Sequence, residues 1–171
     1  MKRVIKTLNE MSFELPNGYK VSQDKYQLMN GQGFFNRENY VSADGKVISL
    51  FEVHREPDEF LQGYKVLTRK YRDVTDKYEL CKEFSLKVGE FLFPTFVIRG
   101  YNEKLLYVIQ VFVNCGNALG CFMINIDNWT DDVKEAIKKN SLFNDLVKLL
   151  RTIEWKNCYY IVVVGHVAHR L

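Results

Sequence analysis

KLLYVIQVFVNCGNALGCFMINI, residues 104–126, predicts two adjacent strands joined by a turn at Cys115-Gly116-Asn117. In the first strand, one face carries only apolar residues: Leu105, Tyr107, Ile109, Val111 and Val113. The opposite face is also largely apolar, with Leu106, Val108 and Phe112. A strand that is apolar on both faces is typical of a sheet covered above and below. We therefore expect layers of structure on both sides of this strand.

Working outward, two further strands precede this pair, so that four strands form an antiparallel meander over Tyr78–Phe84, Phe91–Arg99, Lys104–Asn114 and Ala118–Ile126. Earlier in the chain, Ser42-Ala43-Asp44-Gly45 separates two strand-like runs, Phe34–Val41 and Lys46–His54. An Asp-Gly pair in this position predicts a hairpin. Pro94 cannot donate a ladder hydrogen bond, which indicates a bulge or an edge at that point.

Three segments have the features of helices. Pro57–Arg72 has Pro in its first turn, acids at its start and bases at its end. Asp131–Lys139 follows Thr130 as a candidate N-cap, and the segment from Ser141 to Ile153 has Ser141 in that role. The last segment has an apolar stripe formed by Leu142, Phe143, Leu146, Val147, Leu150 and Ile153. The predicted class is α+β, an antiparallel meander flanked by helices in an α/β/α sandwich.

Length and charge set the broad class of protein. The 171 residues fit one domain, residues 1–171, with a core over about residues 11–155 and a C-terminal tail over residues 156–171. A net charge of +3 gives no reason to expect a nucleic-acid partner. The N-terminal residues contain no apolar run of signal-peptide length, and no segment approaches a membrane span of about 20 apolar residues. We therefore expect a cytoplasmic protein.

Cysteines and histidines give no cofactor or metal signature. The four cysteines have no regular spacing, and Cys121 is expected opposite Phe112, out of step with Cys115, so a disulfide between these two cysteines is not expected. Cys158, His166 and His169 provide only three of the four ligands of a closed zinc site. The sequence therefore predicts no metal, no cofactor and no catalytic residue.

The order of parts resembles that of a known superfamily. An F-x-L-P-x-G-Y opener at Phe13–Tyr19 is followed by a hairpin, a helix, a meander ending in Phe122–Ile126 and an amphipathic helix. Over roughly Met11 to Trp155, this order resembles the PsbP-like and DcrB-like α/β/α sandwich proteins. That resemblance implies a binding module, since the superfamily includes a photosystem accessory protein, a nuclear Ran-binding protein, periplasmic lipoproteins and chaperones of secreted effectors.

The leading hypothesis is therefore a bacterial-type, non-enzymatic module that binds another protein, as an accessory or chaperone-like protein. One alternative is a protein that holds a small apolar ligand between sheet and helix. A hydrolase or thiol enzyme is a more remote alternative. A homodimer is compatible with each of them.

Two surfaces are candidates for partner contact. Lys65, Arg69 and Arg72 recur at i, i+4 and i+7 and form a basic stripe, which meets an acidic protein or a phosphate-bearing surface, or is a solvated helix face. In the tail, an uncharged β-prone run predicts strand addition to a sheet edge of its own chain or of a neighbouring molecule: Tyr159, Tyr160, Ile161, Val162, Val163 and Val164.

Overall fold

The computed structural model describes residues 3–6, 11–22, 26–30, 33–54, 78–102, 104–114, 118–155, 163–164 and 167–168. The predicted helix at Pro57–Arg72 lies outside these residues. None of the described helices has the length and apolar character needed to cross a bilayer.

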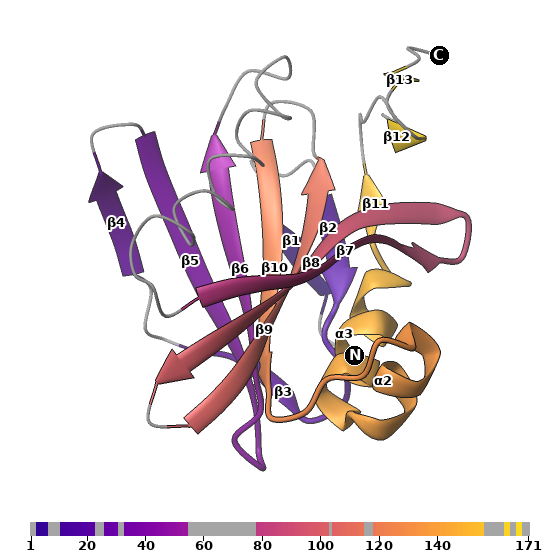
Figure 1. Cartoon of the computed structure of the whole chain (residues 1–171). Helices are drawn as coiled ribbons and strands as arrows, with labels where there is room; N and C mark the ends of the chain where they lie inside the picture. The colour runs from indigo at the N-terminus through magenta and orange to yellow at the C-terminus, as the bar shows by residue number, and fades with distance from the viewer. Residues whose placement is uncertain are drawn as a thin grey trace.

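The main element is an eight-stranded antiparallel sheet (Figure 1). Seven strands follow the order β3-β5-β6-β10-β9-β8-β7, and β4 also pairs with β5. The strands are β3 (Tyr19–Val21), β4 (Tyr26–Asn30), β5 (Gly33–Ser42), β6 (Val47–His54), β7 (Tyr78–Val88), β8 (Phe91–Asn102), β9 (Lys104–Asn114) and β10 (Ala118–Ile126). The predicted meander from β7 to β10 and the predicted β5–β6 hairpin are confirmed. Gly45, with φ +81°, supplies the left-handed residue that the hairpin turn requires.

The opener and the chain after the helices meet in a second, smaller sheet. Its order is β1-β2-β11, with β1 at Arg3–Lys6, β2 at Met11–Glu14 and β11 at Glu154–Trp155. The helices α2 (Val133–Lys139) and α3 (Ser141–Leu150) come just before β11. Two short strands, β12 (Val163–Val164) and β13 (Val167–Ala168), pair with each other.

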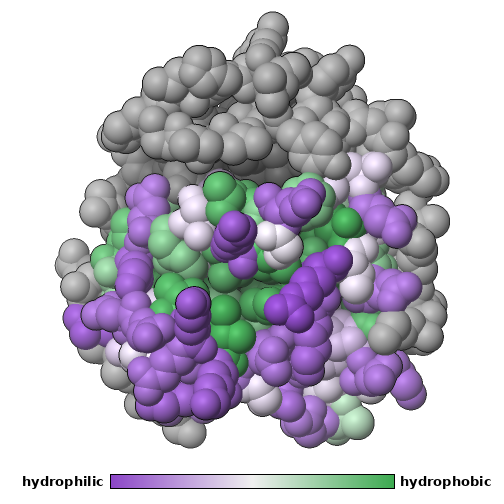
Figure 2. Space-filling view, turned by 90° about the vertical axis from the view of Figure 1, so that its right-hand side faces the viewer, coloured by the Kyte–Doolittle hydropathy of each residue, from purple (hydrophilic) through white to green (hydrophobic). Residues whose placement is uncertain are grey.

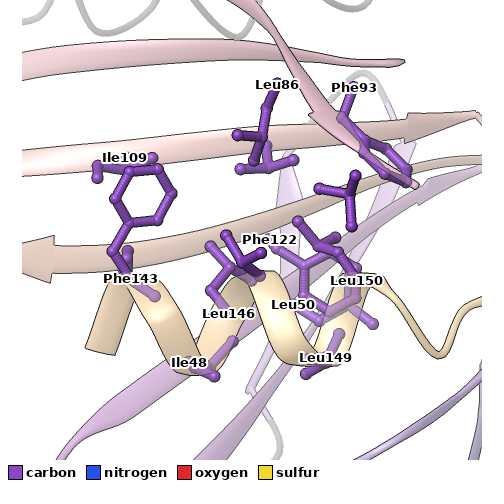
Figure 3. Close-up of a cluster of buried hydrophobic side chains, with 14 of the residues drawn as sticks. Ile48, Leu50, Leu86, Phe93, Ile109, Phe122, Phe143, Leu146, Leu149 and Leu150 are labelled. Carbon is purple, nitrogen blue, oxygen red and sulfur yellow. The ribbon is translucent and has the colours of Figure 1, made fainter. Parts of the chain in front are cut away.

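The core lies between α3 and one face of the main sheet. Figure 3 shows Phe143, Leu146 and Leu150 of this helix among side chains from the strands, including Ile109 and Phe122. Phe13 of the opener adds edge-to-face contacts with Tyr40 and Phe122, at ring-centroid distances of 5.6 and 5.3 Å. Burying each large apolar side chain contributes about 1.5–3 kcal/mol. The main core of this α+β fold is thus built around one amphipathic helix, α3.

The opposite face of the sheet carries a second, smaller buried cluster, formed by Phe96, Ile98, Val108, Phe112 and Cys121. Cys121 pairs with Phe112 across β10 and β9, as predicted. Apolar burial on both faces of β9 agrees with the apolar pattern of its sequence.

Several predicted details were wrong. Asp132 caps α2, by accepting from the backbone N–H groups of Lys134 and Glu135, so Thr130 is not the cap. Asn140 caps α3 in place of Ser141, and that helix ends at Leu150, although Ile153 beyond it is buried.

The region around Pro94 also differs in part from the prediction. The register irregularity lies in β7, between Leu80 and Lys82, and Pro94 itself pairs in register with Ser85. On its other side, the β8–β9 ladder begins at Thr95, so Pro94 lies just outside it and no bond to β9 is lost there.

Candidate binding site

A hollow of about 630 Å³ lies where the β5–β6 hairpin, β10 and the start of α3 come together. The groups that line it are mostly polar or charged. They come from β5 (Arg37, Asn39), the hairpin turn (Asp44, Gly45, Lys46), β6 (Val47, Ser49), β10 and the residue after it (Met123, Ile124, Asn125, Ile126, Asp127) and the start of α3 (Asn140, Ser141, Leu142).

Strand register places the polar groups in a row. Asn39 pairs with Ser49, and Ser49 pairs with Met123, across β5, β6 and β10. Alternate residues of a strand point to opposite faces. Because Ile48 and Phe122 pack in the core with α3, Ser49 and Met123 project from the opposite face.

Arg37 is the charged group that β5 contributes to the hollow. Its Nε donates to Asn39 Oδ1 at 3.2 Å, and Nη2 donates to Ser49 Oγ at 3.5 Å. The guanidinium also lies over the ring of Phe51, with Cζ 5.2 Å from the ring centroid. The side chain is half-buried, and within the described residues none of its contacts is a carboxylate.

Ser49 and Asn39 hold this arrangement together. The Ser49 hydroxyl donates to Asn39 Oδ1 at 2.7 Å, so the same amide oxygen receives hydrogen bonds from both Ser49 and Arg37. An amide oxygen accepts hydrogen bonds but does not serve as a base near neutral pH. The Ser49 hydroxyl is therefore positioned as part of the scaffold and is not activated as a nucleophile.

The rim of the hollow contains a compensated ion pair. Lys46 Nζ lies 2.7 Å from Asp44 Oδ2 in the hairpin turn. The hydrogen bonds from Lys46 and Ser42 lower the pKa of Asp44, and the hydrogen bond to Asp44 raises the pKa of Lys46. Both groups are charged near neutral pH and largely cancel each other. Among the described residues, Arg37 is therefore the cation of the hollow without a carboxylate contact.

Sequence reasoning did not single out Arg37, Asn39 or Ser49. The signal that could have found them is the alternation on β5, where Arg37 and Asn39 share one face and Tyr40 lies on the other. Two polar residues two positions apart on a strand, whose hairpin partner is largely apolar, indicate a face of the sheet that lies outside the main core. The sequence shows this alternation but not which groups on β6 and β10 lie beside it.

The predicted contact residues lie mostly outside the described residues. This holds for Lys65, Arg69 and Arg72 and for residues 159–162 of the tail, while Val163 and Val164 pair with β13. Among the cysteines, Cys121 is buried, which raises the pKa of its thiol, and Cys81 is exposed. Within the described part of the chain, no three His, Cys, Asp or Glu side chains are grouped as a metal site.

A second surface lies on the side of the molecule formed by α2, α3 and the β7–β8 hairpin. Figure 2 shows hydrophobic residues on this side, surrounded by hydrophilic ones. Phe84 stacks on Trp129 with ring centroids 6.2 Å apart, and both are half-buried at the margin of the main core. Trp129 Nε1 is buried and has no hydrogen-bond partner among the described residues.

Comparison with known proteins shows a likeness of fold. The cyanobacterial PsbP protein CyanoP from Synechocystis sp. PCC 6803 is similar with a TM-score of 0.53 and 16% identity, over 91% of this chain and 92% of that one. A crystal structure from Bacteroides thetaiotaomicron has a TM-score of 0.51 and 12% identity, over 93% of this chain, which spans 50% of that protein. The Ran-binding protein Mog1p from Saccharomyces cerevisiae matches with a TM-score of 0.49 and 13% identity, over 90% of this chain and 94% of that one.

The predicted PsbP-like fold is thereby confirmed. The chain matches no protein-family model, and no curated protein sequence is significantly similar to it.

Proposed function

We propose that this chain is a non-enzymatic module that binds another protein through the hollow at β5, β6 and β10, in an accessory or chaperone-like role in the cytoplasm. The observation that carries the proposal is the placement of Arg37. The half-buried Arg37 lines a hollow of about 630 Å³, and among the described residues its guanidinium contacts neutral groups only. A charge held in this way is ready to meet a complementary group on a partner.

The contacts inside the hollow favour binding over catalysis. A nucleophilic serine needs a base to take its proton, and the Ser49 proton is donated to an amide. A guanidinium donates hydrogen bonds and has no acceptor, so Arg37 cannot take the Ser49 proton. The groups around Ser49 therefore orient and attract but do not exchange protons.

The same contacts favour a protein over a small apolar ligand. Apolar-ligand sites are lined mainly by hydrophobic side chains, whereas this hollow is lined mainly by amides, hydroxyls and charges. The space between sheet and α3, where an apolar ligand was the alternative, is occupied by side chains such as Ile109, Phe122 and Leu146, each 0% exposed. That part of the core has no room for a ligand without displacing them.

Site-specific photo-crosslinking in the source cell tests the proposal. A benzophenone amino acid replaces the exposed Asn125 at the hollow, or, as matched control, the exposed Lys87, which lies three strands away from β10 along the sheet. We expect one discrete protein adduct from position 125 and none from position 87, with the adduct reduced by Arg37→Gln. Equal adducts at both positions, or none at either, contradict a partner at the hollow.

The basic stripe remains a separate proposal for partner contact. Changing Lys65, Arg69 and Arg72 together to Glu is expected to weaken the position-125 adduct if the stripe and the hollow meet one partner, with little change in melting temperature. An unaltered adduct removes the stripe from the interface.

A further inference from the structure

We infer that Arg37 receives a carboxylate, and that the group entering the hollow is an aspartate or glutamate side chain of the partner protein. This inference rests on the proposed function and names the chemistry of its partner.

The contacts of Arg37 leave one edge of its guanidinium available. The group has five N–H donors, of which Nε uses its single one on Asn39 and Nη2 uses one on Ser49. One face of the guanidinium plane lies over the Phe51 ring. The outer edge, with Nη1 and the second N–H of Nη2, makes no hydrogen bond to the described residues. Two parallel N–H groups at that edge match the two oxygens of a carboxylate.

Partial desolvation of Arg37 favours the binding of an anion at this edge. A half-buried cation has lost part of its hydration, and the neutral acceptors Asn39 and Ser49 replace only some of it. An incoming anion compensates the rest, in a region where screening by water is weaker than at an open surface. The hydrogen bonds to Asn39 and Ser49 also hold the side chain in place, so that little rotamer entropy remains to be lost on binding.

The charges around the hollow favour a monoanion over a phosphate dianion. The other cation of the rim, Lys46, is already paired with Asp44 at 2.7 Å, and Asp127 is an exposed acid on the same rim. A dianion would need a second uncompensated cation and would be repelled by Asp127. A single carboxylate needs only Arg37.

The hollow is larger than one side chain. Its volume of about 630 Å³ has room for an acidic side chain together with the backbone that carries it. The side-chain amide of Asn125, which lies on the same face of the sheet as Ser49 and Met123, is placed to meet a backbone. These features fit a segment of protein chain better than a free small anion.

Nuclear magnetic resonance of the full chain tests the inference through the Arg37 Nε–Hε signal, assigned by its loss in Arg37→Gln. The probes are the capped peptides Ac-Ala-Glu-Ala-NH₂ and Ac-Ala-Gln-Ala-NH₂ and inorganic phosphate. We expect the Glu peptide to shift the signal saturably, with a roughly millimolar Kd, and the Gln peptide and phosphate to bind at least about tenfold more weakly. Equal responses to Glu and Gln peptides, a stronger response to phosphate, or no response, overturn the inference.

Two variants distinguish bidentate binding of the carboxylate by the guanidinium from attraction by charge alone and from effects on folding. Arg37→Lys keeps the charge without the fork, and we expect it to bind the Glu peptide about tenfold more weakly than the natural chain. Undiminished binding by that variant overturns the bidentate geometry. Lys87→Gln, which removes a cation far from the hollow, should bind the peptide as the natural chain does.

The peptide and crosslinking experiments test the carboxylate inference and the proposed function independently. An adduct at position 125 that persists in Arg37→Gln leaves the proposed function standing and removes the carboxylate inference. Glu-peptide binding without any adduct leaves an anion site and removes the protein partner.

Discussion

Gln110 places a primary amide in the middle of the main sheet, on β9, where it is 1% exposed. Its Nε2 donates to Met123 Sδ at 3.7 Å, a weak acceptor, and its Oε1 has no hydrogen-bond partner among the described residues. An unsatisfied buried acceptor costs about 1–3 kcal/mol, because its hydration is lost without replacement. The residue is thus a local weakness in an otherwise well-packed sheet.

Replacing Gln110 with Met is therefore expected to stabilise the fold. Met has a similar volume and no polar atom to satisfy, so the free energy of unfolding should rise by about 1 kcal/mol. Urea denaturation monitored by tryptophan fluorescence measures this change. Gln110→Ala is the control, since it removes the same amide but leaves a cavity and should lower stability. A Gln110→Met variant less stable than the natural chain would show that the amide has a role the described contacts do not reveal.

Tyr19 ties the opener to α3. Its hydroxyl donates to Asp145 Oδ2 at 3.2 Å, and the other oxygen of that carboxylate lies 3.0 Å from Lys148 Nζ. Burial and the neighbouring Asp145 carboxylate raise the pKa of Tyr19 well above its ordinary value near 10. The neutral phenol is therefore the form that the folded state requires.

Tyr19→Phe should lower the free energy of unfolding at neutral pH by about 1 kcal/mol, the contribution of one hydrogen bond to a carboxylate in a partly solvated setting. Above pH 10 the unfolded chain loses the tyrosine proton while the folded chain keeps it. The stability of the natural chain should then fall, by at most about 1.4 kcal/mol per pH unit from this group, and Tyr19→Phe should lack that component. Urea titrations of both proteins from pH 7 to about 11 measure the difference. A constant gap between them across this range contradicts the argument.

The elements show where sequence patterns are informative. The strands from β5 to β10 were predicted because each is a run of β-prone residues between turn residues, and only the ends of some of them differ from the prediction. For example, β7 continues to Val88, so the turn after it falls at Gly89–Glu90, where Gly89 has φ +62°. The strands β1, β2, β3, β4 and β11 have two to five residues, and pattern alone does not reveal runs that short. The hollow depends on the pairing of β5, β6 and β10, which periodicity does not specify.

Helix starts show the same limit at finer detail. Thr130 and Asp132 are both good N-caps, as are Asn140 and Ser141, so propensity does not choose between neighbours. In the structure, Asn140 Oδ1 accepts a hydrogen bond from the Phe143 N–H at 3.0 Å. Because Phe143 is buried, its position fixes where the first turn of α3 begins.

This choice gives a paired prediction. Asn140→Ala removes the capping bond of α3 and should lower the free energy of unfolding by about 1 kcal/mol. Ser141→Ala should leave it within about 0.5 kcal/mol, because Ser141 is exposed and makes no side-chain hydrogen bond among the described residues. Thermal and urea unfolding of the two variants in parallel decide the matter. A larger loss from Ser141→Ala would return the cap to the residue that the sequence pattern favoured.

For the whole molecule, we expect the C-terminal tail to affect solubility or oligomeric state. The uncharged run over residues 159–164 is expected to add as a strand to a sheet edge, although two of its residues, Val163 and Val164, also pair with β13. A chain ending at Trp155 should then lose solubility or change its oligomeric mass, measured by light scattering after size-exclusion chromatography. An equally soluble chain of unchanged mass would show that the tail is dispensable.

The two ends of the described core depend on each other. In the small sheet, β2 lies between β1 and β11, with Met11 opposite Trp155, and the Glu14 N–H donates to Thr152 Oγ1 at 2.8 Å. Trp155 also packs edge-to-face on Phe91, with ring centroids 4.8 Å apart, so β11 joins the opener to the tip of the β7–β8 hairpin. Residues 144 positions apart thus form one structural unit.

A chain ending at Ile153 should therefore be less stable than one ending at Trp155, although only two residues separate them. The shorter chain loses the β2–β11 ladder and the aromatic contact with Phe91, together worth about 2 kcal/mol or more. Urea unfolding of both truncations measures the difference, and Trp155→Phe in the longer chain, which keeps the ladder and part of the ring contact, should fall between them. Equal stability of the two truncations would mean that the opener is held by Phe13, Leu15 and Tyr19 alone, without help from the strand that follows α3.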